Sequence, residues 1–292
     1  MMNALAWIFR SLNANIITTR FEWVRKPLKV LFLASEQFRN RSLKKLQGKP
    51  TWCVIDNFDH NVKVKVDRSR TMGASLYWTG FHEMREFIFL HRMLEKEMVA
   101  LDVGANLGEY TLFLAKRLTN GRVLSFEPLE LVRRQLEENV RLNNFKNVTI
   151  FDFGLSNQKQ TLTLHEVDDG NEGLGTLFLG NKKSKRSVDV PLEALDGKWT
   201  SMGLNRLDFI KIDVEGSELF ALQGARDTIT KFKPIVLIEV SEENFKAAGY
   251  TTAAIQSFFN DLGYRLCRLD KRGELVSSEM MPMFGNVIFV PR

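Results

Sequence analysis

The chain has 292 residues, 44% of them apolar and 26% charged, which is typical of a soluble globular protein of one large domain or a domain with an appendage. Its two cysteines, Cys53 and Cys267, are far apart and its four histidines are scattered, so we expect no disulfide framework and no zinc site. The net charge of +6 is concentrated in residues 1–49, where ten basic side chains outnumber two acidic ones, and the remaining chain carries −2.

Residues 1–50 are predicted to form a basic helical arm, because apolar residues such as Trp7, Leu12 and Ile16 recur at roughly helical spacing. Two interpretations stay open. The helices pack on the main domain, or they form a basic amphipathic surface that docks on an anionic membrane or an acidic partner. The first apolar stretch, Ala4 to Phe9, is too short for a signal-peptide core or a membrane span. We therefore expect a cytoplasmic protein, with a peripheral membrane location as the alternative.

Residues 51–98 are predicted to be a lead-in made of strand and helix. Apolar and basic residues alternate over Val62 to Val66, which predicts a short exposed strand or hairpin within 51–80. Residues 81–97 have the pattern of an amphipathic helix.

Strands and helices alternate regularly in residues 99–292, which we expect to be the main domain. Seven strands are expected at 99–103, 122–126, 148–153, 208–214, 234–240, 264–269 and 286–291. Helices are expected at 107–118, 129–144, 217–230 and 251–262. This order implies right-handed crossovers and a doubly wound, mostly parallel α/β sheet of seven strands. Residues 165–187 interrupt the rhythm, and they are either a surface loop or hairpin or a lid over a substrate.

The loop after the first of these strands is the most informative segment. Gly104 allows a sharp turn close to a ligand, Gly108 lets the next helix begin close to the sheet, and Asp102 lies at the strand's carboxyl end, where ligands bind in such sheets. A dinucleotide site needs a further glycine where this chain has Asn106, and the acids Asp102 and Glu109 would repel a diphosphate. An acidic loop suits a ligand with an ammonium group and no phosphate, such as S-adenosylmethionine.

Two more acids follow the next strands. Glu127 comes 19 residues after Gly108, where an acid accepts hydrogen bonds from ribose hydroxyls, and the alternative role is a helix N-terminal cap. Asp152, just before Gly154, ends the third strand, beside the expected position of adenine.

Five segments of the chain together resemble the FkbM-type methyltransferases: LDVGANLGEYTL (101–112), FEP (126–128), GLS (154–156), DFIKIDVEGSELFALQGA (208–225) and PIVLIEV (234–240). The resemblance covers about residues 80–240. It implies a class I, Rossmann-like methyltransferase fold with S-adenosylmethionine as cofactor. It also implies O-methylation of a sugar hydroxyl in a glycan, a glycolipid or a natural product.

The resemblance also assigns residues. It maps the glycine loop onto Asp102 to Thr111, the ribose-binding acid onto Glu127, the fourth-strand motif onto Lys211 to Gly216, and the stretch that closes over the cofactor onto His82 and Glu83. The cofactor-binding residues expected on this basis are Glu83, Asp102, Gly104, Ala105, Asn106, Gly108, Glu109, Tyr110, Thr111, Glu127, Pro128, Asp152 and Gly154.

Methyl transfer to a sugar hydroxyl requires alignment and a base, because the hydroxyl is a poor acid. Asp213 and Glu215 end the fourth strand and share one face if the chain stays extended, although Glu215 is also a candidate helix cap. Glu239 and His82 are the further catalytic candidates. Paired carboxylates hold Mg²⁺ in some O-methyltransferases, but the spacing requires no metal here and we predict none.

Three other functions compete with methylation of a sugar hydroxyl. A nucleotide-linked oxidoreductase is disfavoured by the acidic loop, and a non-catalytic scaffold by the intact glycine loop. A nucleic-acid methyltransferase would fit the basic arm, but residues 213–216 are Asp-Val-Glu-Gly instead of the Asn/Asp-Pro-Pro-aromatic motif of base-amine methylators. The expected partner is a carbohydrate or small-molecule hydroxyl acceptor, with contact to an anionic membrane through residues 1–49 and with no nucleic acid.

Overall fold

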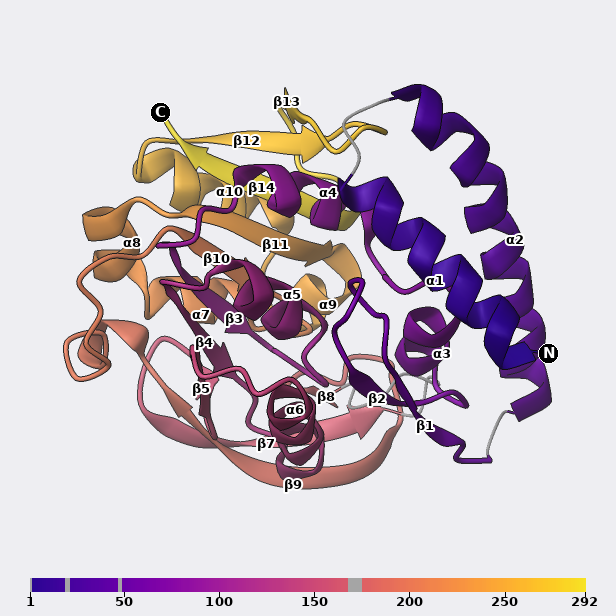
Figure 1. The fold of residues 1–292 in the computed structure, drawn as a ribbon. Helices are drawn as coiled ribbons and strands as arrows, with labels where there is room; N and C mark the ends of the chain where they lie inside the picture. Colours follow the sequence, from indigo (N-terminus) through magenta and orange to yellow (C-terminus); the bar gives the residue numbers. More distant parts are fainter. Residues whose placement is uncertain (1, 19–21, 47–48, 168–174) are drawn as a thin grey trace.

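A central sheet of eight strands organises the structure (Figure 1). The structure is a computed structural model that describes residues 2–18, 22–46, 49–167 and 175–292, and for residues 22–31 it describes the backbone alone. Its strands are β3 (Val99–Val103), β4 (Arg122–Phe126), β5 (Val148–Phe151), β10 (Phe209–Ile212), β11 (Ile235–Ser241), β12 (Tyr264–Leu269), β13 (Leu275–Ser277) and β14 (Phe284–Pro291). The order across the sheet is β13-β12-β14-β11-β10-β3-β4-β5. Strands β5 to β11 in that order pair in parallel, whereas β14 is antiparallel to β11 and β12. The seven expected strands are present, and β13 adds an eighth at one edge.

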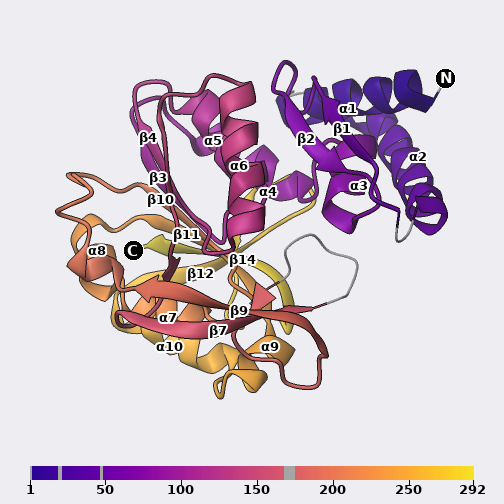
Figure 2. The same cartoon turned by 90° about the horizontal axis from the view of Figure 1, so that it is seen from below.

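Helices cover both faces of this sheet (Figure 2). One face carries α4 (Met84–Met93), α5 (Glu109–Arg117) and α6 (Glu130–Leu142). The other carries α7 (Glu218–Gln223), α8 (Arg226–Phe232), α9 (Glu242–Ala247) and α10 (Thr252–Asp261). Side chains alternate along β3, so Ala100 joins the core on the first face while Leu101 and Val103 join the core on the second. This two-sided burial explains why the strands are apolar runs.

The single helix predicted at 217–230 is instead two short helices, α7 and α8. They are separated at Gly224, whose backbone lies so close to Ser156 that an added Cβ would be 1.9 Å from the Ser156 carbonyl oxygen. The chain changes direction there to pack against the segment after β5.

A second, four-stranded sheet replaces the interruption noted at 165–187. It consists of β6 (Gly154–Leu155), β7 (Gln160–Val167), β8 (Gly175–Thr176) and β9 (Ser184–Glu193), in the order β6-β9-β7-β8, and a 3₁₀ turn, η1 (Leu195–Gly197), follows it. The hairpin interpretation is therefore correct for the described part of 165–187, and residues 168–174 lie outside the described residues. The third strand ends at Phe151 instead of Phe153, because Gly154 and Leu155 pair with β9.

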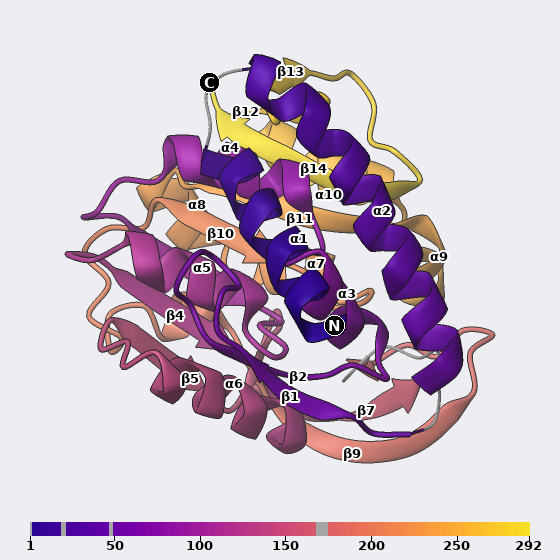
Figure 3. The same cartoon turned by 45° about the vertical axis from the view of Figure 1, so that its right-hand side comes forward.

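The N-terminal part contains α1 (Met2–Thr18), α2 (Glu22–Leu46), β1 (Trp52–Ile55), β2 (Val64–Asp67) and α3 (Thr71–Trp78), with α1 beside α2 (Figure 3). Helix α1 also contacts α3 and α4, and the ring of Phe38 lies 5.8 Å from that of Phe9 and 5.4 Å from that of Trp78. Strands β1 and β2 form the expected hairpin. Helix α3 was not predicted, because residues 73–78 are all buried and therefore show no amphipathic period.

In the described parts of the chain, no helix combines the length and the apolar character needed to cross a membrane.

Asp59, in the loop between β1 and β2, fastens the N-terminal part to α5. Its side chain is fully buried, with one carboxylate oxygen 2.5 Å from Arg117 Nη1 and 3.4 Å from Lys116 Nζ. Burial would raise the pKa of Asp59, but the charges of Arg117 and Lys116 lower it below its ordinary value. The ion pair is therefore present only while Asp59 is ionised.

We expect Asp59→Asn to lower the free energy of unfolding by about 3–5 kcal/mol, because it leaves two partly buried cations without their partner. Because the folded-state pKa is lowered, this contribution is complete above about pH 4 and is lost as the pH falls through the folded pKa. Urea unfolding of both proteins across this range measures it. Glu130→Gln, which breaks the exposed pair with Arg134, is the control and should change stability by less than about 1 kcal/mol. Equal losses in the two variants would contradict the role of Asp59.

Candidate active site

The main cavity lies where the carboxyl ends of β3, β4, β10 and β11 meet, and its lining comes from the loops that follow these strands. Strand β3 is paired with β4 on one side and with β10 on the other. The chain order reverses at this point, and ligands bind at such a point in open α/β sheets. Strands β7, β8 and β9 and the segment 82–83 complete the walls.

The glycine loop approaches the next strand more closely than any side chain would permit. Gly104 has a φ of +78°, and a Cβ added to it would lie 1.9 Å from the carbonyl oxygen of Asp213. Gly108 has a φ of +101°, and its missing side chain makes room for Leu136 of α6. Gly104 is therefore required at the cavity, whereas Gly108 serves the packing behind it.

Asp102 lies behind the loop and not in the cavity lining. It is fully buried and accepts a hydrogen bond from Thr111 Oγ1 at 2.6 Å, while its other oxygen is 3.9 Å from Lys211 Nζ. Burial raises the pKa of Asp102, and Lys211 opposes that effect. Asp102 and Thr111 thus support the loop and Lys211 from within the core.

Glu127 lines the cavity at the end of β4 and is 7% exposed. Its two carboxylate oxygens accept hydrogen bonds from the backbone amides of Asn106 and Leu129, each at 3.0 Å. Leu129 directly precedes α6, so Glu127 does stabilise the beginning of that helix. Each carboxylate oxygen has a second lone pair, so Glu127 retains the capacity to bind hydroxyl groups. Burial raises the pKa of Glu127 to about 7.

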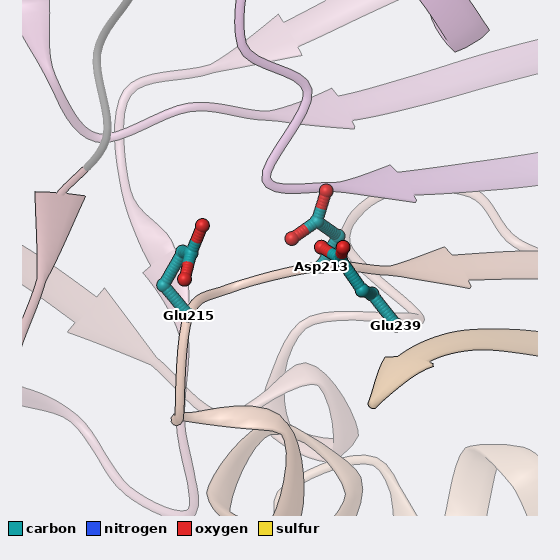
Figure 4. A group of neighbouring side chains, drawn as sticks. All are labelled: Asp213, Glu215 and Glu239. Carbon is teal, nitrogen blue, oxygen red and sulfur yellow. The ribbon is translucent and has the colours of Figure 1, made fainter. Parts of the chain in front are cut away.

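Three carboxylates from two strand ends lie together in the cavity, with oxygens of Asp213, Glu215 and Glu239 within 4.8 Å of one another (Figure 4). Asp213 also accepts a hydrogen bond from Lys211 Nζ at 3.1 Å. The charge of Asp213, together with burial, raises the pKa of Glu239 to about 11. Burial opposes ionisation of Asp213, but Lys211 and Glu239 hold its pKa below the ordinary value. Glu239 therefore keeps its proton at neutral pH and donates it to Asp213. A divalent cation would also fit the spacing of these three carboxylates.

Glu215 reaches the same cavity by a turn and not along an extended strand. Strand β10 ends at Ile212, and Glu215 has a φ of +51°. Its carboxylate accepts a hydrogen bond from Asn244 Nδ2 at 2.6 Å, and burial followed by the charge of Asp213 raises its pKa to about 7.

The capping role considered for Glu215 is performed by Glu218 of α7. Glu218 accepts hydrogen bonds from the backbone amides of Val214 and Gly216, each at 3.0 Å. The hydroxyl of Tyr250 donates to the same carboxylate at 3.2 Å. Glu215 therefore does not cap α7, and its side chain lines the cavity.

The segment before α4 closes one wall. Glu109 accepts a hydrogen bond from the backbone amide of His82 at 2.8 Å, and burial raises the pKa of Glu109 to about 8. Glu83 accepts hydrogen bonds from the hydroxyl of Tyr110 and from the side-chain amide of Asn286 on β14. Nothing in the sequence pointed to Asn286, because β14 follows Glu83 by some two hundred residues.

The structure brings most of the predicted site residues into the lining of one cavity: His82, Glu83, Gly104, Ala105, Asn106, Glu109, Tyr110, Glu127, Pro128, Gly154, Asp213, Glu215 and Glu239. Asp102, Gly108 and Thr111 lie behind it, and Asp152 is exposed and outside the lining. The apolar wall of the cavity was not indicated by the sequence, and it consists of Leu129, Leu155, Leu164, Leu177 and Leu192. Lys211 was not expected to be a site residue, although a lysine inside the apolar strand Phe209–Ile212 was a visible signal.

The charge of the lining indicates the class of ligand. Six carboxylates line the cavity, those of Glu83, Glu109, Glu127, Asp213, Glu215 and Glu239. Lys211 is the single lysine or arginine of the described lining, and Asp213 and Asp102 neutralise it. A cationic ligand would relieve the repulsion among these buried acids, whereas a diphosphate would add to it. The residues therefore fit S-adenosylmethionine, whose sulfonium and ammonium groups are cationic and whose adenine suits the apolar wall.

Comparison with known proteins also indicates a methyltransferase. Residues 102–266 match the model of the methyltransferase FkbM domain. The chain is 29% identical over 209 residues to the AMB antimetabolite synthetase AmbE of Pseudomonas aeruginosa. The aligned region covers 60% of this chain and 10% of the synthetase. The chain is also 28% identical over 197 residues to methyltransferase sdnD of Sordaria araneosa. Here the aligned region covers 58% of this chain and 74% of sdnD.

Two solved structures are similar at low identity. The methyltransferase FkbM of Methylobacillus flagellatus has a TM-score of 0.44 at 15% identity and covers 88% of this chain and 60% of its own. A protein of Streptococcus mutans in complex with SAH has a TM-score of 0.40 at 15% identity and covers 69% of this chain and 93% of its own. The chain thus spans one tenth of the synthetase and about three fifths of the Methylobacillus protein.

The match to the family model covers more than half of the chain and includes the glycine loop, Glu127 and the carboxylates of β10 and β11. The chain therefore belongs to the FkbM methyltransferase family and uses S-adenosylmethionine as its cofactor.

Proposed function

We propose that this protein transfers the methyl group of S-adenosylmethionine to a hydroxyl of a carbohydrate, carried on a glycan, a glycolipid or a natural product. The observation that carries the proposal is a single cavity with the glycine loop and Glu127 at one part of its wall and three carboxylates at another. Carboxylates bind hydroxyl groups by hydrogen bonds and accept their protons, which a sugar hydroxyl requires.

The cofactor is held by the residues around the glycine loop. Gly104 lines the cavity within the glycine loop, and Glu127 accepts hydrogen bonds from the ribose hydroxyls. Leu129, Leu155 and Leu192 form the apolar surface for adenine. When bound, S-adenosylmethionine supplies an electrophilic methyl group attached to a sulfonium.

The acceptor is oriented and deprotonated by the carboxylate group of the cavity. Asp213, fixed by Lys211 and by the proton of Glu239, holds a neighbouring hydroxyl in place. Glu215 is the general base, because its pKa of about 7 suits proton transfer near neutral pH. His82, which also lines the cavity, and Glu239 are the secondary candidates.

We also propose that residues 1–50 and 51–98 are an arm and a lead-in to a catalytic domain at 99–292. The partner of the arm is an anionic membrane surface, at which the protein works from the cytoplasm. Exposed basic side chains support this, namely Arg41, Lys44, Lys45 and Lys49 on and after α2. Met2 and Ile8 of α1 are about half exposed, at 52% and 47%, and add apolar surface.

Glu127→Gln should weaken the binding of S-adenosylhomocysteine about tenfold or more. Each carboxylate oxygen of Glu127 can accept a backbone hydrogen bond and a ribose hydroxyl at once, whereas the amide nitrogen of glutamine can accept neither. Isothermal titration calorimetry measures the dissociation constant. Asp152→Asn, an exposed acid outside the cavity lining, is the matched control and should leave the constant unchanged. A normal affinity in a folded Glu127→Gln protein would reduce Glu127 to a helix cap.

Glu215→Gln should lower kcat by about 10²- to 10⁴-fold, with little change in the affinity for S-adenosylhomocysteine, because it removes the base and not the cofactor contacts. In the unmodified enzyme, kcat/KM should rise as the pH increases through about 7, since Glu215 accepts a proton only when ionised. The assay follows tritium from labelled S-adenosylmethionine into a panel of glycans, glycolipids and RNA. Label in RNA alone would overturn the carbohydrate acceptor, and an unchanged pH profile in Glu215→Gln would assign the base elsewhere.

A further inference from the structure

A second cavity lies in the N-terminal part, between α1, β1 and α3, and shares no lining residue with the methyl-transfer cavity. Helix α1 contributes Trp7 and Arg10, and α3 contributes Tyr77. Arg68, the residue after β2, and Val54 of β1 also line the cavity. The proposed methyl transfer uses none of these residues.

Two guanidinium groups meet in this cavity around one aromatic ring. The Cζ atoms of Arg68 and Arg10 lie 4.0 Å and 5.3 Å from the centroid of the Tyr77 ring. Arg10 is 4% exposed and donates to Asn57 Oδ1 at 2.6 Å and to the carbonyl oxygen of Tyr77 at 2.5 Å. Its neutral partners hold it in place without compensating its charge.

Neither arginine forms an ion pair with any of the residues that the structure describes. Burial lowers the pKa of Arg10 to about 10, which shows that its positive charge is poorly solvated. Asp56 is the single carboxylate among the described lining residues, and it is exposed. Within the part of the chain that the structure describes, Nε of Arg68 is buried and has no hydrogen-bond partner. Buried charged donors without partners are unfavourable, so this cavity fits a ligand that brings oxyanion acceptors.

The rim of the cavity is apolar and exposed. Trp7 is 48% exposed and Val54 53% exposed, and both line the cavity. Trp52 lies two residues before Val54 on the same face of β1 and is 52% exposed. Tryptophan is favoured where an apolar layer meets water, as at the level of lipid headgroups.

We propose that the cavity formed by Arg10 and Arg68 binds the phosphate of an anionic membrane phospholipid, with Trp7 and Val54 inserted among the headgroups. Arg68 provides guanidinium donors to phosphate oxygens, the buried charge of Arg10 adds to the attraction, and the apolar rim explains why the phosphate is carried on a lipid. This inference gives the proposed membrane contact a defined headgroup site. It does not depend on methyl transfer.

Co-sedimentation of the full-length protein with vesicles tests the site. Vesicles of phosphatidylcholine with phosphatidylglycerol should retain the protein, and vesicles of phosphatidylcholine alone should not. Arg68→Gln should lower the partition coefficient about fivefold, as expected for one basic contact to an anionic surface. Arg68→Lys should retain part of the binding, because it keeps the charge and loses the fork.

Arg134→Gln on α6 is the matched control, since it removes an exposed arginine that pairs with Glu130 outside this cavity. An equal loss of binding in Arg134→Gln and Arg68→Gln would mean attraction by net charge alone and would overturn the headgroup site. Trp7→Phe tests the insertion: vesicles with brominated acyl chains should quench the tryptophan fluorescence of the unmodified protein more than that of the variant.

Alkylation of Cys53 separates a lipid from a free anion, because Cys53 lines the cavity whereas the other cysteine, Cys267, is buried in the main sheet. Phosphatidylglycerol vesicles should slow the reaction of Cys53 with a maleimide. Protection by inorganic phosphate without vesicle binding would replace the lipid with a soluble phosphate ligand. Protection by neither would overturn the anion site. Titration with S-adenosylhomocysteine confirms that each variant is folded, and it tests the proposed function separately.

Discussion

The buried ammonium group of Lys211 is the interaction on which the active site depends. Lys211 is 5% exposed, and its Nζ lies 3.1 Å from Asp213, 3.9 Å from Asp102 and 3.3 Å from the carbonyl oxygen of Gly104. Burial alone would lower the pKa of Lys211, but Asp213 and Asp102 raise it above its ordinary value, so it stays charged. One cation thereby fixes the glycine loop after β3 against the end of β10, beside the three carboxylates of the cavity.

The same charge distributes the protons of the other acids. Because Lys211 stabilises the ionised form of Asp213, the repulsion between Asp213 and Glu239 is relieved by protonating Glu239. Glu215 accepts a hydrogen bond from Asn244, and its pKa of about 7 is set by burial and by the charge of Asp213. The three carboxylates of this cluster thus differ in their tendency to bind a proton. Under the proposed function, this difference lets one site both orient a hydroxyl and deprotonate it.

The N-terminal part is joined to this site through shared packing. Asp59 binds Arg117 and Lys116 on α5, the helix whose first turn carries Glu109 and Tyr110. The aromatic core continues from Phe81 to Phe87, and from Phe87 to Tyr110 at 4.7 Å between ring centroids. The N-terminal part, which holds the second cavity, is therefore packed against the helix that contributes Glu109 and Tyr110 to the main cavity. An enzyme held at a membrane by that part would present its active site in a fixed orientation.

The sequence by itself determined the main sheet, the glycine loop and the acids that end β4, β10 and β11, because periodicity and spacing are local properties that survive folding. It did not determine α3, whose residues are buried on all sides and have no amphipathic period. It also could not show that Glu218 takes the cap considered for Glu215, or that Asn286 reaches Glu83. Nor could it show that the helix expected at 217–230 breaks at Gly224. Only the tertiary structure decided these points, because each depends on a contact between segments whose spacing along the chain carries no signal.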